Sequence, residues 1–489
     1  MNSANLTVSF RLVQKYALWE LDPMQYISSR GEAPSLDFGD VLLEGLAIDG
    51  GLYLPNHWPS ITTDDITKSP NGDESYIDVA IEILEPFTSG SLKREELREL
   101  VTRAYESFTH PEIIPLKELG PNMWLMELFH GPTLAFKDVA LQLVGQMFDH
   151  ELSKRQERIT IVGATSGDTG SAAIDACRDR PTIDIVILHP HKRTSEVQRR
   201  QMTTVESPNV HNIAVEGTFD DCQDLVKAMF LDTKFRNEQN LSAINSINWA
   251  RVMAQIVYYW WAAITLGRKG GQIEFSVPSG NFGNIFAGYG SYLMGLEVSK
   301  FIVGTNQNEV LHRFFQSGSM TATDVVPTLS PSMDIQIPSN FERLLFEMYN
   351  RDGTAVKETL AEFRSSGVLD VAPQELKEIQ EKWSSARIDD DATLRTIEEI
   401  YKETGELIDP HTAVGIAAGK ERRTSEQTPL VCLGTAHPGK FPEAVIKATG
   451  KEPELPTSLQ DLYDRTEHYS VLPNDYDLVR SYIEKIVRV

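Results

Sequence analysis

The sequence predicts an α/β fold built on a parallel sheet whose two faces are covered by helices. The chain has 489 residues, more than a single hydrophobic core usually contains, so two or three lobes are expected. Short β-branched runs alternate with helical patterns along most of the chain, which is typical of a parallel sheet. Three turns rich in small and polar residues follow predicted strands, where ligands bind in such folds.

The pattern of apolar residues predicts the elements in chain order. Strands are expected at 158–164, 183–190, 211–217, 272–277 and 300–306, with a last strand-to-helix unit at 429–445. Helices are expected within 75–107, at 171–178, at 219–230, and from Ile285 onward. The apolar run at 256–267 predicts a buried helix, because a membrane-spanning helix needs about 20 residues. The charged interval 350–405 has a helical pattern and no site-like motif, so a peripheral helical insertion is expected there.

The charge balance excludes some classes of partner. The chain has 46 basic and 70 acidic residues, a formal net charge of −24, which disfavours nucleic acid and anionic membranes. An anionic small molecule would therefore need a few locally placed donors. The three cysteines, Cys177, Cys222 and Cys432, are far apart and lack zinc-site spacing, which predicts a reducing compartment and a cytoplasmic location.

The sequence leaves open whether residues 1–23 belong to the mature protein or target it. They lack the long apolar core of a secretory signal. They contain Arg11 and Lys15 and no acidic residue before Glu20, a pattern similar to a transit peptide. The alternative is a simple extension or a start assigned too early, because Met24 follows at once.

Lys137 lies in the otherwise apolar run "HGPTLAFKDVALQ" (130–142), which opens a predicted helix. Burial removes hydration from an ammonium group and lowers the pKa of the amine. A neutral amine can attack a carbonyl and then move protons, so Lys137 is the candidate catalytic residue.

Two of the turns suit anions. "SGNFGN" (279–284) joins a strand to a helix, and its glycines let main-chain N–H groups converge on a phosphate. The alternative is an ordinary tight turn. In "TSGDTG" (165–170), main-chain amides and the hydroxyls of Ser166 and Thr169 suit a carboxylate, and the alternative is a helix N-cap.

A third segment, "NSINWARVMAQ" (245–255), suits a second anion. Asn245, Ser246 and Asn248 precede a helix, and Arg251 lies one turn inside it. The alternative is a surface arginine beside a capping residue. His130, His411 and His437 occur in turns without the spacing of metal ligands, so no metal is predicted.

Taken together, these motifs describe one kind of cofactor. A desolvated lysine, a phosphate cradle and a carboxylate clamp fit pyridoxal 5′-phosphate (PLP), whose aldehyde would bond to Lys137.

Several motifs closely resemble the threonine synthase family, in its yeast and enteric branch. These are "FHGPTLAFKDVALQ", "VGATSGDTGSAA", "VPSGNFGN", "SPSMDIQIPSNFERLLFE" and "TAHPGKFPEA", with the N-terminal signature "YISSRGEAPSLDFGDVLLEGLAIDGGLYLP". The resemblance runs from about Met24 to near the C-terminus. It implies a fold-type II PLP enzyme, similar to the tryptophan synthase β chain, with parallel and mixed sheets covered by helices in two main lobes.

The resemblance also implies a reaction and an organisation of the chain. The family is a group of carbon–oxygen lyases that convert O-phospho-L-homoserine and water into L-threonine and phosphate, the last step of threonine biosynthesis. Monomer and homodimer both stay open. The expected regions are an extension at 1–23, a family-specific N-terminal region at 24–120, a smaller lobe with the PLP lysine at 121–270, and a larger lobe at 271–489 that contains the 350–405 insertion and C-terminal helices.

Individual roles follow from the matched motifs. Lys137 would bond to the cofactor, and the cofactor phosphate would be held by Gly280, Asn281, Phe282, Gly283 and Asn284. Thr435 would contact the pyridine nitrogen and Asp168 the cofactor ring. The substrate carboxylate would be held by Ser166, Gly167 and Thr169. The substrate phosphate would be held by Asn245, Ser246 and Arg251, with Asn340 and Arg343 as further candidates; for these two a salt bridge is the alternative.

Two other functions stay open on the sequence alone. A serine or threonine dehydratase needs the same lysine and phosphate cradle but no second anion site. A catalytically silent homologue would have no need for Lys137, both glycine loops and Thr435.

Overall fold

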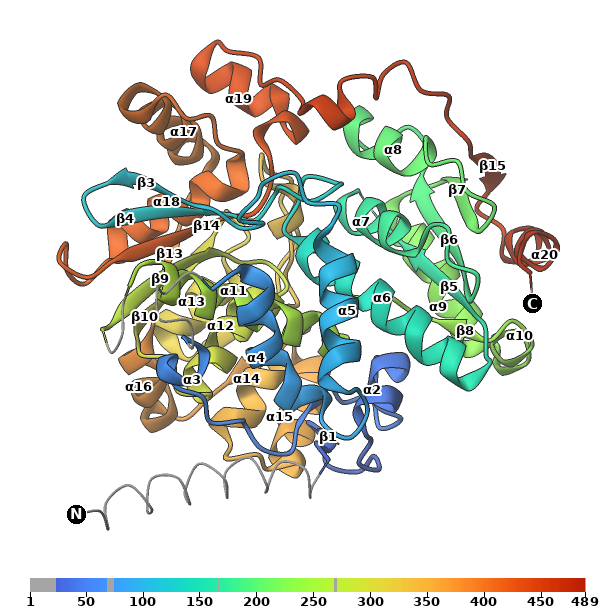
Figure 1. The fold of residues 1–489 in the computed structure, drawn as a ribbon, viewed down its shortest axis with the longest axis horizontal. Helices are drawn as coiled ribbons and strands as arrows, with labels where there is room; N and C mark the ends of the chain where they lie inside the picture. Colours follow the sequence, from blue (N-terminus) through green and yellow to red (C-terminus); the bar gives the residue numbers. More distant parts are fainter. Residues whose placement is uncertain (1–22, 68–73, 166, 268–270, 489) are drawn as a thin grey trace, which may run out of the picture.

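A computed structural model describes residues 23–67, 74–165, 167–267 and 271–488. Two main sheets form the framework, the smaller on the right of Figure 1 and the larger on the left. All neighbouring strands of the smaller sheet are parallel, in the order β15-β7-β6-β5-β8. Its strands are β5 (Ile159–Ala164), β6 (Ile183–Pro190), β7 (Val210–Glu216), β8 (Leu241–Ser242) and β15 (Ser470–Pro473).

The larger sheet has the order β13-β10-β9-β14-β4-β3 and is parallel except for the β3–β4 pair. Its strands are β3 (Leu116–Gly120), β4 (Met123–Glu127), β9 (Ile273–Pro278), β10 (Val298–Thr305), β13 (Trp383–Arg387) and β14 (Leu430–Gly434). The predicted α/β class with parallel and mixed sheets is confirmed.

Both sheets are covered by helices because their strands are apolar on both faces. Every residue of β6 is buried, as is every residue of β9 and β14. Helices α7 (Asp168–Cys177) and α9 (Phe219–Leu231) pack on the smaller sheet, and α18 (Pro410–Arg422) packs on β9, β10 and β14. The strands and helices therefore form where the alternating pattern predicts them.

A buried helix, α11 (Trp249–Thr265), connects the two halves of the molecule. It packs against α4 (Tyr76–Thr88), α6 (Lys137–Arg155) and α12 (Gly283–Leu293), and residues 249–263 are all buried. The prediction of a buried helix here is confirmed, with an earlier start at Trp249. Within the described ranges, no helix is long and apolar enough to cross a membrane.

The remaining elements complete the layers around these sheets. Two short antiparallel pairs, β1–β2 and β11–β12, lie outside the main sheets. The bounds are β1 (Tyr26–Ser28), β2 (Tyr53–Pro55), β11 (Ser319–Thr321), β12 (Val368–Asp370), α2 (Phe38–Glu44), α3 (Thr63–Ile66), α5 (Arg94–Tyr105), α8 (Glu196–Thr203), α10 (Thr233–Glu238), α13 (Val310–Ser317), α14 (Phe341–Met348), α15 (Gly353–Ser366), α16 (Pro373–Lys382), α17 (Asp390–Thr404), α19 (Pro442–Thr449) and α20 (Tyr476–Ile486).

The chain crosses between the sheets more often than the expected ranges 121–270 and 271–489 imply. Strand β4 belongs to the larger sheet although it precedes the smaller one in sequence. Near the C-terminus, β15 pairs with β7, and α20 packs against β15 and α9. Each sheet is thus completed by a segment from the other end of the chain. Residues 1–22 lie outside the described residues.

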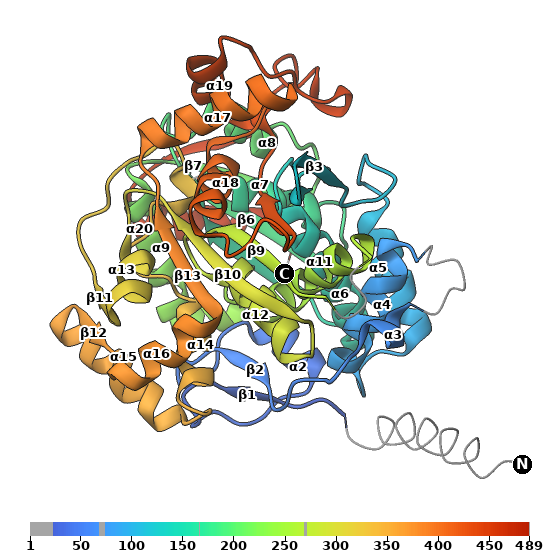
Figure 2. The same ribbon diagram turned by 90° about the vertical axis from the view of Figure 1, so that its left-hand side faces the viewer.

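The interval 350–405 contains more than the expected helices. Besides α15, α16 and α17 it contributes β12 and β13, and β13 pairs in parallel with β10 at the edge of the larger sheet (Figure 2). The expectation of a purely helical, peripheral insertion is corrected on this point. The reason is burial, because Trp383, Ser385 and Ala386 pack inside although charged helices flank them.

Candidate active site

Main-chain pairing places Lys137 beside Thr435. The residues before Lys137 pair with the end of β14 through an antiparallel bridge between Ala135 and Ala436. The amide of Phe136 donates to the carbonyl of Thr435 at 2.9 Å, and α6 begins at Lys137. Two residues that are far apart in the sequence are therefore held on adjacent segments at one edge of the larger sheet.

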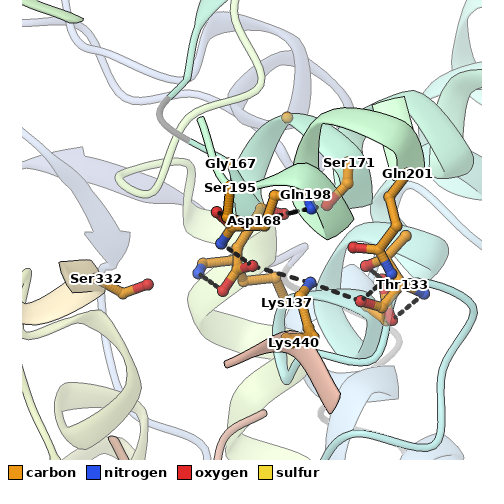
Figure 3. A network of polar contacts seen from close by, with 12 residues as sticks. Thr133, Lys137, Gly167, Asp168, Ser171, Ser195, Gln198, Gln201, Ser332 and Lys440 are labelled. Carbon is orange, nitrogen blue, oxygen red and sulfur yellow. Dashed lines mark hydrogen bonds and ion pairs between the residues drawn. The ribbon is translucent and has the colours of Figure 1, made fainter. Parts of the chain in front are cut away.

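A buried carboxylate, Asp168, meets the amine of Lys137. Nζ of Lys137 lies 3.2 Å from Oδ2 of Asp168, the first residue of α7 (Figure 3). The other oxygen, Oδ1, lies 2.9 Å from Nζ of Lys440 and accepts a hydrogen bond of 2.8 Å from Nε2 of Gln198. Asp168 therefore connects the turn at 165–170 to Lys137. The family resemblance had implied a contact between Asp168 and the cofactor ring.

Burial and charge set the protonation of this pair. Burial lowers the pKa of Lys137; Asp168 opposes that shift, while Lys440 and Arg251 add to it. Burial alone would raise the pKa of Asp168, but the two neighbouring ammonium groups hold it well below its usual range. Asp168 is therefore a stable anion, and Lys137 loses its proton more readily than an ordinary lysine.

The turn at 278–284 has the backbone of an anion cradle. Phe282 adopts a left-handed conformation with φ of 65°, and α12 begins at Gly283, so the first amides of the helix have no partner within it. A Cβ at Gly280 would lie 2.9 Å from the carbonyl oxygen of Ser332 and 3.0 Å from Cα of Met333. Only glycine at this position lets the cradle pack this closely against the main chain of Ser332 and Met333.

Asn284 presents an unused donor at this cradle. Its Oδ1 accepts hydrogen bonds from the hydroxyls of Tyr258 at 2.5 Å and Tyr259 at 2.9 Å. These bonds fix the orientation of the amide and leave Nδ2 buried, with no partner among the described residues. A buried donor without a partner is costly, so this amide fits an anionic group such as the phosphate of PLP.

Arg251 also has buried donors without partners among the described residues, and its side chain is charged. Its side chain is buried on α11, and Nε and Nη1 have no hydrogen-bond partner within the described part of the chain. Burial lowers the pKa of this guanidinium to about 10. Its charge also lowers the pKa of Lys137, so the guanidinium acts electrostatically on that amine. Arg251 therefore stays a prediction for the second anion site, and its unpartnered donors fit that role.

Asn245 and Ser246 lie on the segment that leads into α11. Oδ1 of Asn245 accepts the amides of Ile247 and Asn248 at 3.1 Å each, and Asn248 caps the helix. The hydroxyl of Ser246 accepts a hydrogen bond from Nδ2 of Asn281. The structure therefore brings Ser246 to the cradle, whereas the Asn245 oxygen is used in the local turn.

Asn340 and Arg343 are bonded to main-chain carbonyls. Nδ2 of Asn340 donates to the carbonyls of Ser246 and Asn281 at 3.1 Å each. Arg343 is fully buried, and it donates to the carbonyl of Tyr53 through Nε and Nη2 and to that of Ile247 at 2.6 Å. These two residues hold the segments on which the cradle is built.

The 165–170 turn combines capping with the site. The amides of Gly167 and Gly170 both donate to Oγ1 of Thr165 at 3.0 Å, so these groups serve the N-terminus of α7. Thr169 is half-buried in the first turn of that helix, and Ser166 lies outside the described residues. Of this turn, the contact that reaches Lys137 is the one from Asp168.

His411 forms contacts with two neighbouring segments. His411 contacts Oδ1 of Asp409 through Nδ1 at 2.8 Å and accepts the amide of Ser332 at Nε2 at 3.1 Å. Asp409 also accepts the hydroxyl of Thr412, which in turn accepts the amide of Thr435 at 3.1 Å. This chain of contacts links the end of β14 to the segment that packs on Gly280.

Two residues of the site were missed by sequence reasoning. Lys440 ends the turn at 434–440, and its position after a strand of the parallel sheet was a usable signal. Gln198 lies on α8 outside any motif, so the sequence offers no signal for it.

Comparison with known proteins agrees with this geometry. The family profile "Threonine synthase N terminus" matches residues 25–105, "Pyridoxal-phosphate dependent enzyme" matches 110–362, and "Threonine synthase, C-terminal" matches 412–483. The threonine synthase of Pseudomonas aeruginosa is 52% identical over 463 residues, covering 94% of this chain and 98% of the relative.

Solved structures give the same result. The PLP-bound threonine synthase from Brucella melitensis is 48% identical, with a TM-score of 0.93, over 95% of this chain and 100% of that structure. The yeast threonine synthase is 36% identical, with a TM-score of 0.89, over 94% and 98% of the two chains. This chain belongs to the threonine synthase family of pyridoxal-phosphate-dependent enzymes.

Proposed function

We propose that this chain is a carbon–oxygen lyase that converts O-phospho-L-homoserine and water into L-threonine and phosphate, the last step of threonine biosynthesis. The observation that carries this proposal is the presence of two buried cations with different properties. Lys137 is an amine whose pKa is lowered by burial and by the charge of Arg251, and Arg251 has donors without a partner among the described residues. A reaction that needs both a PLP lysine and a second anion site fits this arrangement.

The residues around Lys137 would hold the cofactor. Lys137 would bond to its aldehyde, the amides of 280–284 and Nδ2 of Asn284 would bind its phosphate, and the hydroxyl of Thr435 would face its ring nitrogen. When bound, PLP supplies an electron sink for bonds broken at the substrate carbon that bears the amine. The orphaned donor of Asn284 supports this assignment.

Lys137 would then carry protons. Its neutral amine would accept the protons that substrate Cα and Cβ lose and would return protons at Cγ and Cα. The lowered pKa of Lys137 suits this role, because a lysine that stays charged cannot accept a proton. Asp168 would hold the amine in place between transfers, since the two atoms are 3.2 Å apart.

The second anion site would bind the phosphate that leaves from substrate Cγ. Arg251 and Ser246 are its candidates, because Arg251 has free donors and Ser246 is fixed at the cradle by Asn281. Asn245 remains a further candidate for this phosphate, and Gly167 and Thr169 remain candidates for the substrate carboxylate. Asn340 and Arg343 would act as positioning residues, since their donors are bonded to main-chain carbonyls.

Turnover of O-phospho-L-homoserine tests the proposed function. Phosphate and L-threonine should appear in equal amounts with purified chain and added PLP. Release of phosphate without threonine would contradict synthesis, and absence of both products would contradict the assigned substrate. L-Threonine alone is the matched control, because a dehydratase would convert it into a 2-oxo acid and ammonia.

The remaining properties of the chain are consistent with a small-molecule enzyme in the cytoplasm, the location we propose. Its three cysteines are free and buried, and burial raises the pKa of each thiol to about 12. Such thiols suit a reducing compartment. The net charge of −24 disfavours a polyanionic partner, so the local cations of the site would select the anionic substrate.

A further inference from the structure

Lys440 is a second buried lysine in the site, and the reaction outlined above gives it no part. It ends η2 (Pro438–Lys440), and its side chain has no exposed surface. Its Nζ lies 2.9 Å from Oδ1 of Asp168 and donates to the carbonyl of Thr133 at 2.7 Å. Asp168 therefore lies between two lysines, with one ammonium group at each carboxylate oxygen (Figure 3).

The two lysines differ in what they must do. Lys137 has to leave Asp168 in order to react, and a buried carboxylate that loses its counter-charge is costly. Lys440 does not have to leave Asp168. Its ammonium contacts both the carbonyl of Thr133 and Asp168, and these two contacts hold it in place. Its pairing with Asp168 uses the oxygen that Lys137 does not contact.

We propose that Lys440 is a positioning residue that keeps Asp168 paired when Lys137 leaves it, so that Lys137 can give up its proton and bond to the cofactor. This inference rests on the proposed function. Lys440 would make it easier for Lys137 to leave Asp168, and Lys440 itself would contact neither the substrate nor the cofactor.

The charged groups around Lys137 support this role. Asp168 on α7 holds the proton on Lys137, whereas Lys440 on η2 and Arg251 on α11 oppose it. Without Lys440, Lys137 and Asp168 would form an isolated buried pair, in which the carboxylate has one cation to hold. The amine would then keep its proton to a higher pH, and the neutral form needed for bonding would be rarer.

Neighbouring amides share the acceptors of Lys440 and supply a control. Two glutamines one helical turn apart on α8 donate to the same groups, Gln198 to Oδ1 of Asp168 and Gln201 to the carbonyl of Thr133 at 3.1 Å. They hold these groups with neutral donors. A change at Gln201 therefore perturbs the packing at Thr133 without removing a charge.

The test follows capture of the cofactor and needs no substrate. The full-length chain is stripped of coenzyme with hydroxylamine and mixed with PLP across a pH series, and the rate at which bound-coenzyme absorbance appears is recorded. Variants K440Q and K440M should move the midpoint of the pH–rate profile upward by about one unit, which slows capture about tenfold near neutral pH. K440R and the control Q201M should keep the wild-type midpoint.

Two outcomes would overturn the proposal. One is an unchanged midpoint in K440Q although its capture is slower, which would indicate a purely structural role. The other is a shift in K440R as large as that in K440Q, which would exclude the charge as the cause. If K440M fails to fold, the pair K440R and K440Q decides, because both keep a donor for Thr133. If the wild-type chain captures no PLP, the proposed function is overturned as well. If wild-type capture is normal, either of the two outcomes above overturns only the role proposed for Lys440.

Discussion

The two sides of the candidate site use their polar groups differently. On the lysine side, Asp168 is paired with Lys137 and Lys440, so each charge has a partner within the chain. On the arginine side, Arg251 and Asn284 bury donors that have no partner among the described residues. Because unpaired buried donors are costly, the arginine side is where we propose that anions bind. The paired side suits proton transfer, and the unpaired side suits binding.

The same contrast separates the two buried arginines of this region. Arg343 is fully buried and is bonded to carbonyls of Tyr53 and Ile247. Arg251 is also buried, yet two of its nitrogens have no partner among the described residues. Burial of a cation therefore does not identify a binding residue by itself. The distinguishing property is whether its hydrogen bonds are already made.

The largest effect is expected at Lys137 on the paired side. K137A should lower kcat by about 10³-fold or more, because it removes both the covalent link and the proton carrier. Steady-state kinetics with O-phospho-L-homoserine measure this. The folded state should tolerate the change, since the variant removes an amine whose charged form is disfavoured by burial. Near-normal turnover in K137A would refute the assigned role.

Arg251 tests the unpaired side. R251M should raise the KM for O-phospho-L-homoserine about 100-fold, because a buried cation that binds a phosphate is lost. Coenzyme retention after dialysis should stay near the wild-type level, and stability should be equal or higher, since a desolvated charge is removed. If coenzyme is lost while KM holds, Arg251 belongs to the cofactor phosphate instead.

Arg343 is the matched comparison. R343M should lower the free energy of unfolding by about 3 kcal/mol, because the carbonyls of Tyr53 and Ile247 lose buried donors. Denaturant unfolding of the two methionine variants side by side measures the difference. A stable R343M with a large rise in KM would show that the contrast between the two arginines is wrong.

Gly280 sharpens the description of the cradle. G280A should weaken coenzyme retention about tenfold, because the added Cβ meets the main chain of Ser332 and Met333 at 2.9 and 3.0 Å. G120A is the control, since the nearest atom to its Cβ is the flexible end of Met123 at 4.0 Å. Fluorescence titration with PLP compares them. Equal affinities would mean that close packing at position 280 does not shape the cradle.

The smallest effect concerns pH. The pKa of Lys137 is lowered from 10.5, so its neutral form appears at a lower pH than for an exposed lysine. The rate of PLP capture should therefore rise with pH with a midpoint below pH 10.5. A midpoint at or above that value would contradict the burial argument for the paired side.

The fold and the main contacts of the site follow from local sequence patterns. Apolar runs predict the strands that precede the three turns. The turns at 278–284 and 434–440 follow neighbouring strands of the larger sheet, β9 and β14, and the turn at 165–170 follows β5 of the smaller sheet. Lys137, Asp168 and Thr435 were related to one cofactor through the family motifs in which they occur, and not through the predicted strands. Strand β13 was missed because it is short and lies between charged helices.

Contacts between distant segments could not be predicted. Gln198 reaches Asp168 from α8, a helix with no motif, and the sequence carries no sign of that approach. Arg343 has the composition of an anion-binding residue, but its partners are carbonyls of residues nearly 300 and 100 positions away in the chain. What a buried charge faces depends on packing, which a local pattern does not contain.

The most direct test of the account identifies the lysine that bonds to the coenzyme. The holoenzyme is reduced with borohydride and digested, and the peptides are analysed by mass spectrometry. We expect the mass of reduced coenzyme on Lys137, whose amine lies across one carboxylate from that of Lys440. Labelling of Lys440, or a chain without any label, would contradict the assignment of Lys137 as the lysine that bonds to PLP.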